Sequence, residues 1–164
     1  MTAQRRPMNI YERALEKFGR SRPGLFFAQK IAPVLDPPLM RLTGGRLSSV
    51  YPLPLMLLTT IGAKSGLRRE HPLAYATDGD SLIVIASNYG RPGHPAWYRN
   101  LVANPRVEVL AGKHSGVYTA REIADEAERS AAWKKALDVY AGYGDYEVRA
   151  GNRKIPVIRL VRSA

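Results

Sequence analysis

Short apolar runs separated by turn residues dominate the chain from residue 51 onward. Residues 55–61 are apolar and β-branched at their end, and residues 69–77 follow after a loop with two glycines. Residues 81–87 form a third apolar run behind an Asp-Gly pair that suits a tight hairpin. Runs of this length and composition predict β-strands. The same pattern predicts strands at 106–112, 115–123 and 155–161.

The N-terminal part of the chain shows the hydrophobic periodicity of helices. Residues 8–20 place apolar side chains on one face and charged side chains on the other, with Asn9 as a cap. Residues 24–35 predict a second, short helix that the Asp-Pro-Pro sequence at 36–38 ends, because proline interrupts a helix. Both helices are expected to pack on the domain or on a partner subunit, or to form a basic amphipathic lid at the inner face of the membrane.

Two further helices stand between the predicted strands. One covers residues 94–105, and the other begins at Asp125, where Glu128 completes a capping-box-like start. Paired strands with few intervening helices predict an α+β protein built on an antiparallel barrel, and they exclude a doubly wound sheet. We expect a helical extension over residues 1–50 and a barrel domain over residues 51–164.

The composition is that of an ordinary globular protein. The chain has 164 residues, of which 45% are hydrophobic and 24% charged, so one domain with a substantial core is expected. It has no cysteine, which excludes disulfides and thiolate chemistry. No apolar run is long enough to cross a bilayer or to act as a signal peptide, so we expect a cytoplasmic protein.

The net charge of +11 is concentrated at the N-terminal end. Residues 1–70 hold 12 Lys/Arg against 4 Asp/Glu, whereas residues 71–164 hold 13 against 10. Such a surplus attracts nucleic acid, an anionic membrane surface or a polyanionic small molecule. The sequence contains no basic-aromatic RNA motif and no recognition-helix pattern, so nucleic acid is not the expected partner.

Several kinds of catalytic site have no supporting motif in the sequence, although the composition alone does not exclude a Ser-His-Asp triad. His71, His94 and His114 lack the spacing of a metal site, and we expect no bound metal. The sequence has no Gly-x-Ser-x-Gly elbow and no P-loop. The remaining interpretation is a redox or binding site whose reactivity comes from a cofactor.

The loop Gly62-Ala-Lys-Ser-Gly66 lies between two predicted strands. Its glycines allow backbone N–H groups to approach a ligand, and Lys64, Ser65, Arg68 and Arg69 add donors suited to phosphate or carboxylate. The pattern indicates an anion site, with a solvated hairpin loop of ordinary basic composition as the alternative.

A second segment, residues 86–105, combines a strand end with a turn and a helix start. Gly90 and Gly93 let the chain turn close to a flat ligand, and the helix directs its first N–H groups into the same space. Trp97 and Tyr98 supply aromatic surface. The alternative is that Trp97 belongs to the core and that the loop is a plain connection.

Three stretches together resemble a known family. They are "LLTTIGAKSGLRREHPL", "DGDSLIVIASNYGRPGHPAWYRNLVANPRVEV" and "VYAGYGDYEVRAGNRKIPVIRL", which span about residues 55 to 160. In order and spacing they resemble the deazaflavin-dependent nitroreductases, also described as coenzyme F420-dependent quinone reductases, a branch of the flavin-binding split-barrel proteins. The resemblance implies a split β-barrel that binds reduced 8-hydroxy-5-deazaflavin, in preference to FMN, and passes its hydride to a quinone, nitro or other conjugated acceptor.

The resemblance also implies roles for individual residues. The phosphate and polyglutamate tail of the cofactor would be held by Lys64, Ser65, Gly66, Arg68 and Arg69. The deazaflavin ring would be bordered by Ala86, Ser87, Asn88, Pro95, Trp97 and Asn100. The acceptor would meet Tyr140, Tyr143 and Tyr146, with Ser87 or one of these tyrosines as the proton donor. Packing of a helix end is the alternative role of the tyrosines.

The chain departs from the family pattern at two places. Many relatives have lysine where this chain has Asn88 and glycine where it has Tyr89, and an expected aromatic is replaced by Ala74 followed by Tyr75. These differences bear on contacts to the tail and on the choice of acceptor. A deazaflavin- or haem-binding carrier of the same barrel class that does not turn over substrate is the alternative function, and monomer and homodimer are both left open.

Overall fold

A curled antiparallel sheet forms the centre of the molecule. The computed structural model describes residues 10–163. In this part of the chain seven strands form one sheet, in the order β2-β1-β5-β6-β7-β4-β3 with every neighbouring pair antiparallel. The strands are β1 Leu55–Ile61, β2 Arg68–Ala74, β3 Ala76–Asp78, β4 Ser81–Ile85, β5 Arg106–Leu110, β6 Gly116–Glu122 and β7 Val157–Arg162.

The sheet is a half-barrel because its two edges are consecutive in the chain. β2 and β3 stand at opposite ends of the strand order, yet only Tyr75 separates them. The sheet must therefore curl to bring its edges together, and the predicted antiparallel split barrel is confirmed. The single strand predicted over 69–77 is wrong. Residues up to Ala74 pair with β1, whereas residues from Ala76 pair with β4.

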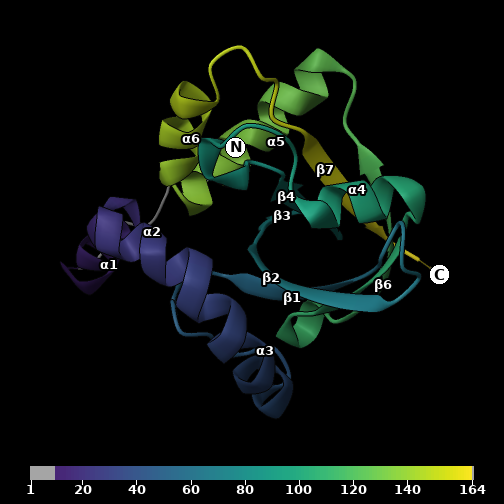
Figure 1. Cartoon of the computed structure of the whole chain (residues 1–164), viewed down its shortest axis with the longest axis horizontal. Helices are drawn as coiled ribbons and strands as arrows, with labels where there is room; N and C mark the ends of the chain where they lie inside the picture. Colours follow the sequence, from purple (N-terminus) through teal and green to yellow (C-terminus); the bar gives the residue numbers. More distant parts are fainter. Residues whose placement is uncertain (1–9, 164) are drawn as a thin grey trace.

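Helices cover both the concave and the convex surface of the sheet (Figure 1). They are α1 Ile10–Arg20, α2 Arg22–Phe26, the π-helical turn η1 Phe27–Ile31, α3 Ala32–Thr43, the 3₁₀ turn η2 Asn88–Gly90, α4 Ala96–Ala103, the 3₁₀ turn η3 Gly112–His114, α5 Glu126–Val139 and α6 Gly142–Ala150. None of the helices in the described part of the chain has the length and apolar character needed to cross a bilayer.

Two hydrophobic cores follow from the two faces of the strands. Trp97 and Leu101 of α4 pack with Met56, Leu58 and other inward side chains of the half-barrel. On the other face, α5 and α6 pack against a second cluster. Its strand and helix residues include Ile83, Ile85, Ala132, Ala136, Tyr143 and Tyr146. Alternation along each strand thus divides the side chains between two cores.

The N-terminal helices extend further than the sequence indicates. Asn9, the predicted cap, lies outside the described residues, and the described helix begins at Ile10. The predicted helix end at 36–38 is wrong, because α3 continues through Pro37 and Pro38 to Thr43. Met40 is completely buried where α3 packs on β1 and β2. We infer that this burial outweighs the backbone hydrogen bonds that the prolines cannot donate.

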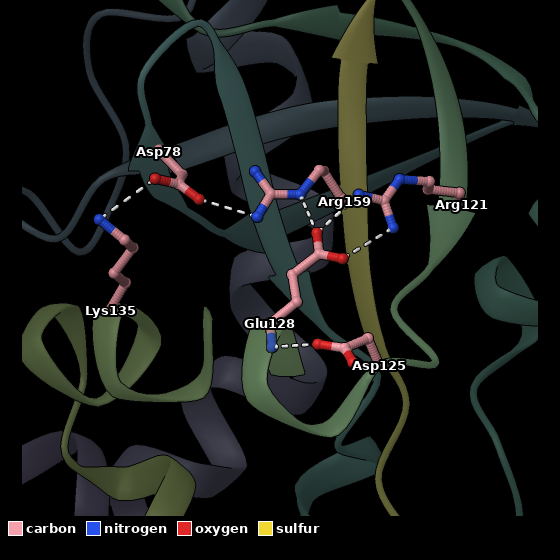
Figure 2. A network of polar contacts seen from close by, with 6 residues as sticks. All are labelled: Asp78, Arg121, Asp125, Glu128, Lys135 and Arg159. Atoms are coloured by element: carbon pink, nitrogen blue, oxygen red, sulfur yellow. Dashed lines mark hydrogen bonds and ion pairs between the residues drawn. The ribbon is translucent and has the colours of Figure 1, made fainter. Parts of the chain in front are cut away.

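An ion-pair network fastens α5 to the sheet (Figure 2). Arg159 of β7 donates to Glu128 Oε1 at 2.7 Å and lies 2.8 Å from Asp78 Oδ2. Lys135 pairs with the same aspartate at 3.2 Å, and Arg121 pairs with the same glutamate at 2.6 Å. The network therefore joins β3, β6, β7 and α5. The helix starts as predicted, since the Asp125 carboxylate accepts from the Glu128 backbone N–H at 2.8 Å.

Candidate functional site

A large cavity lies between the N-terminal helices and the sheet. Its volume is about 680 Å³, within the usual range for sites that bind small molecules. One wall comes from α1, η1 and α3, and another comes from β2. The remaining wall is formed by the end of β4, η2, the start of α4, and the tyrosines of the α5–α6 region. Segments far apart in the sequence therefore meet around one space.

The turn after β4 has a fixed and unusual backbone. Asn88 and Tyr89 have φ values of 51° and 57°, which non-glycine residues adopt at a cost of about 1–3 kcal/mol each. Ser87 Oγ accepts from the Tyr89 backbone N–H at 3.4 Å, and the Asn88 side chain donates to the Pro92 carbonyl at 3.2 Å. Tyr89 Oη donates to the Ala28 carbonyl at 3.1 Å, which ties this turn to η1. Ser87 and Asn88 thus stand in the cavity wall in a defined orientation.

Three tyrosines gather in the same wall. Tyr140 Oη and Tyr146 Oη lie 3.2 Å apart, and the ring centroids of Tyr143 and Tyr146 lie 6.1 Å apart in an edge-on arrangement. Burial is the largest cause of a raised pKa at each of the three phenols. All three therefore stay protonated at neutral pH and can donate hydrogen bonds. Sequence reasoning predicted these residues but not the helix α6, which carries two of them among its glycines.

The Lys64 loop lies outside the wall of the cavity. Lys64, Ser65, Gly66, Arg68 and Arg69 are all absent from the cavity lining. The loop is closed by hydrogen bonds from the Gly62 N–H to the Leu67 carbonyl and from the Gly66 N–H to the Gly62 carbonyl, both 2.8 Å. Gly66 has a φ of 66° with open space beside it. The loop is thus an ordered surface turn that a ligand can approach.

The cations of this loop differ in what they contact. Arg68 makes a two-pronged pair with Glu108, with both N···O distances 2.8 Å. Lys64 and Arg69 have no ion-pair partner among residues 10–163, and both are exposed. Lys64 and Arg69 are therefore available to an anion, whereas Arg68 must first leave Glu108.

Asn100 connects the loop to the cavity. Its Oδ1 accepts from the Ala63 N–H at 3.1 Å and its Nδ2 donates to Thr60 Oγ1 at 3.0 Å. Asn100 is buried and does not line the cavity, and its two hydrogen bonds hold the loop against α4. Pro95 and Trp97, at the start of the same helix α4, do line the cavity. Ala86 is buried in the inner core behind this wall.

These positions suit a ligand with two chemically different parts. The wall formed by Pro95, Trp97 and the tyrosines offers apolar and aromatic surface to a flat ring. The Lys64 loop, which is hydrogen-bonded to Asn100 of α4, offers to an anionic tail two cations without an ion-pair partner among residues 10–163 and open space beside Gly66. The residues present therefore fit a deazaflavin with a phosphorylated, carboxylated tail.

Two residues of the cavity wall were not predicted as site residues. Asp36 was interpreted only as part of a helix end, and His71 was considered only as a metal ligand. Both line the cavity, and each has a buried atom, Asp36 Oδ2 and His71 Nε2, without a hydrogen-bond partner within residues 10–163. Among residues 10–163, no three His, Cys, Asp or Glu side chains group closely enough to hold a metal ion.

Comparison with known proteins agrees with this geometry. The family model of the F420H(2)-dependent quinone reductases matches residues 38–162. The chain belongs to this family. The predicted membership, the predicted oxidoreductase activity and coenzyme F420 as the cofactor are therefore confirmed at the level of the family.

Individual relatives support the same assignment. An F420H(2)-dependent quinone reductase of Mycobacterium tuberculosis is 37% identical over 128 residues, covering 76% of this chain and 85% of that protein. The structure of an F420-H2 dependent reductase, FDR-A, is 41% identical with a TM-score of 0.58, covering 65% of this chain and 93% of that chain. A structure described as a domain-swapped dimer is 35% identical with a TM-score of 0.60, covering 75% of this chain and 93% of that chain.

Proposed function

We propose that this member of the family reduces a quinone or another conjugated acceptor, such as a nitro compound, that binds in the cavity beside Ser87 and the three tyrosines. The observation that carries the proposal is the meeting of these four polar groups in one largely apolar cavity, with free cations on the neighbouring loop. Reduced coenzyme F420 supplies a hydride when it is bound. The protein's part is to orient the ring and the acceptor and to supply hydrogen-bond donors.

The Lys64 loop is proposed to hold the anionic tail. Lys64 and Arg69 supply charge, Ser65 supplies a hydroxyl, and Gly66, whose N–H is already bonded to the Gly62 carbonyl, leaves open space beside the loop for the tail. Arg68 adds a third cation only when the tail competes with Glu108 for it. Asn100 joins the loop to helix α4, which begins after Pro95 and carries Trp97, because its side chain accepts from the Ala63 N–H.

Ser87 and the tyrosines are proposed to serve the acceptor. Ser87 Oγ accepts a backbone N–H, which leaves its own proton free to be donated. The phenols keep their protons at neutral pH, because burial raises their pKa. A negative charge that develops on an acceptor oxygen would therefore meet several donors.

Titration of the purified protein with coenzyme F420, beside FMN, tests this function. We expect F420 to bind and FMN not to bind, and menadione added to the reduced F420 complex to be reduced. Replacement of both Lys64 and Arg69 by alanine is expected to weaken F420 binding about 10- to 100-fold, from the loss of two charge-assisted contacts. Lys134→Ala, which removes an exposed charge on α5, is the control.

Other outcomes would contradict the proposal in identifiable ways. Binding of FMN without binding of F420 would refute the assignment of the tail to Lys64 and Arg69. Tight F420 binding without oxidation by any quinone or nitro compound would favour the carrier function. Equal weakening in Lys134→Ala would show a general effect of net charge and no specific site on the loop.

We further propose that the N-terminal helices contact an anionic membrane surface, where a lipid-soluble quinone would be found. Exposed apolar side chains are spread over α1, α2 and α3, namely Ile10, Tyr11, Phe26, Val34, Leu35 and Leu42. Basic residues flank them. Replacement of Val34 and Leu42 by serine is expected to lower co-sedimentation with anionic vesicles at least about tenfold. Val148→Ser on α6 is the matched control, and an equal loss in that variant would refute the proposal.

A further inference from the structure

Arg153 contacts the turn that carries Ser87 without lining the cavity itself. It stands in the loop between α6 and β7, where its backbone N–H donates to the Ala150 carbonyl at 3.1 Å. Its side-chain Nη2 donates to the Ser87 carbonyl at 2.7 Å. Because Arg153 is not among the lining residues, it does not touch a molecule held in the cavity. Any effect of Arg153 on a reaction there therefore passes through the turn.

The Ser87 carbonyl has a second hydrogen-bond donor. The Gly90 backbone N–H donates to the same oxygen at 3.0 Å. The carbonyl would therefore keep a partner if the guanidinium were removed. The need to satisfy a buried backbone group does not by itself account for Arg153.

The environment of the guanidinium is unfavourable for stability. Its Nε and Nη1 are buried and have no hydrogen-bond partner in the part of the chain that the structure describes. Among residues 10–163, no Asp or Glu forms an ion pair with it. A largely buried cation without an anionic partner lowers the free energy of unfolding. Arrangements that are unfavourable in this way are found mainly at functional sites.

The bond from Arg153 fixes the direction of the peptide between Ser87 and Asn88. Because a peptide unit is planar, the direction of its carbonyl sets the ψ of Ser87 and the φ of Asn88 together. These angles are −31° and 51°. The next N–H, that of Tyr89, donates to Ser87 Oγ at 3.4 Å. The orientation of the Ser87 hydroxyl thus depends on the same backbone that Arg153 holds.

We propose that Arg153 is a positioning residue for the reduction: it holds the Ser87 carbonyl and thereby keeps the Ser87 hydroxyl in the orientation from which it donates to the acceptor. The inference rests on the proposed function, because it concerns how Ser87 serves the acceptor. It deepens that function by adding a residue from the loop before β7, which sequence reasoning did not single out. Arg153 neither touches the acceptor nor gives up a proton.

A double-mutant cycle of Arg153→Met and Ser87→Ala tests the inference on the full chain, with reduced F420 and menadione. Ser87→Ala removes the hydroxyl and is expected to lower kcat about 10- to 100-fold. Arg153→Met should lower kcat about tenfold and leave the KM for menadione within about twofold, because the donated bond strengthens only as charge develops on the acceptor. In the double variant, kcat should match that of Ser87→Ala within about twofold, because Arg153 acts only through Ser87.

Three measurements on Arg153→Met do not depend on turnover. In the free protein, NMR should show the Tyr89 and Gly90 amides exchanging at least about tenfold faster, because both donate to Ser87. Its Tm should equal or exceed that of the wild type, because an unpaired, largely buried charge is removed. Its affinity for F420 should be unchanged, because the Lys64 loop is not altered.

Lys154→Met is the matched control in the same loop. Lys154 pairs with Glu126 at 3.1 Å, and both side chains are exposed. Removal of this neighbouring cation should therefore change neither kcat nor the amide exchange. An equal loss in both variants would show a general effect of charge in the loop and would overturn the role of Arg153.

Other outcomes would also overturn the proposal. A lower Tm in Arg153→Met, or failure of that variant to fold, would mark a structural arginine, as would losses in kcat that multiply in the double variant. Unchanged kcat and exchange in Arg153→Met would show that the Gly90 N–H alone holds the turn. A wild-type kcat in Ser87→Ala would leave Arg153 nothing to position.

Failure of the proposed function has a different signature. It would appear as absent F420 binding or absent menadione reduction in the wild type. The exchange of the Tyr89 and Gly90 amides and the Tm of Arg153→Met would still decide, without coenzyme, whether Arg153 holds the turn or only supports the fold.

Discussion

Replacement of Arg159 by methionine is expected to lower the free energy of unfolding more than the removal of an exposed ion pair does. The Arg159 side chain is only 15% exposed and holds Glu128 and Asp78 at 2.7 and 2.8 Å. Methionine keeps the apolar part of the side chain and removes the guanidinium, leaving two partly buried carboxylates with one cation each.

The expected loss in free energy of unfolding depends on which cations still contact the two carboxylates in the variant. Removal of one partner from a fully buried pair costs about 3–5 kcal/mol. Here Lys135 and Arg121 still contact the two carboxylates, so we expect about 1–3 kcal/mol of the free energy of unfolding to be lost. For a chain of this size that is a fall in Tm of about 3–10 °C. Urea unfolding followed by circular dichroism measures the loss, with the m-value expected to be unchanged.

Acid should remove the difference between the variant and the wild type. At Asp78, burial alone would raise the pKa, but hydrogen bonds from Arg159 and Lys135 outweigh it and lower the pKa. At Glu128, hydrogen bonding from Arg121 is the main cause of a lowered pKa, opposed by burial and supported by Arg159. A carboxyl group with a lowered pKa in the fold stabilises above its unfolded pKa of about 4, and that contribution is lost as the pH falls.

Arg68→Met is the matched control for this prediction. Arg68 makes an equally short pair with Glu108, but the two side chains are 59% and 53% exposed. Exposed pairs contribute little, so its unfolding should match that of the wild type. A wild-type-like Arg159→Met, or an Arg68→Met that is equally unstable, would refute the argument that burial decides the contribution. So would a difference that persists unchanged at pH 3.

Three smaller predictions concern the site. Gly66→Ala should cost about 1 kcal/mol in free energy of unfolding, because its φ of 66° is unfavourable for alanine although nothing fills the space beside it. Denaturant unfolding measures this loss, and a stability equal to that of the wild type would contradict the prediction. Asn100→Ala should cost about 1–3 kcal/mol, because the Ala63 N–H loses its partner, and should weaken F420 binding; normal binding in a folded variant would contradict the positioning role. Tyr89→Phe should speed hydrogen exchange in residues 22–31, because the bond to Ala28 is lost; unchanged exchange would show that other contacts hold η1.

Local sequence determined the elements whose signals are short-range. β1 has the bounds 55–61 that its apolar run predicts, and β3 and β4 form the predicted hairpin, with Gly79 and Asp80 as its two loop residues. The start of α5 at Asp125 follows from the capping residues alone. Each of these features depends on contacts between residues a few positions apart, which pattern and propensity describe well.

Tertiary packing decided the features that local signals misrepresent. Pro37 and Pro38 mark a helix end in the sequence, but α3 continues because Met40 is buried against the sheet. The strand predicted at 69–77 divides at Tyr75 because its two halves pair with different neighbours, β1 and β4. Neither the burial of a helix nor the identity of a strand's partner is contained in a short window of sequence.

The candidate site shows the same division between sequence and tertiary structure. The residue types in the Lys64 loop and in the segment from Ser87 to Trp97 predicted a site for an anionic, partly aromatic cofactor. The oxidoreductase activity and the role of the three tyrosines were implied by the resemblance to the family. That Ser87 and the tyrosines share one cavity with residues of the N-terminal helices was decided by the curling of the sheet and the packing of those helices. The physical reason is that a cavity is made by non-local contacts, which fix both its shape and which charged groups line it.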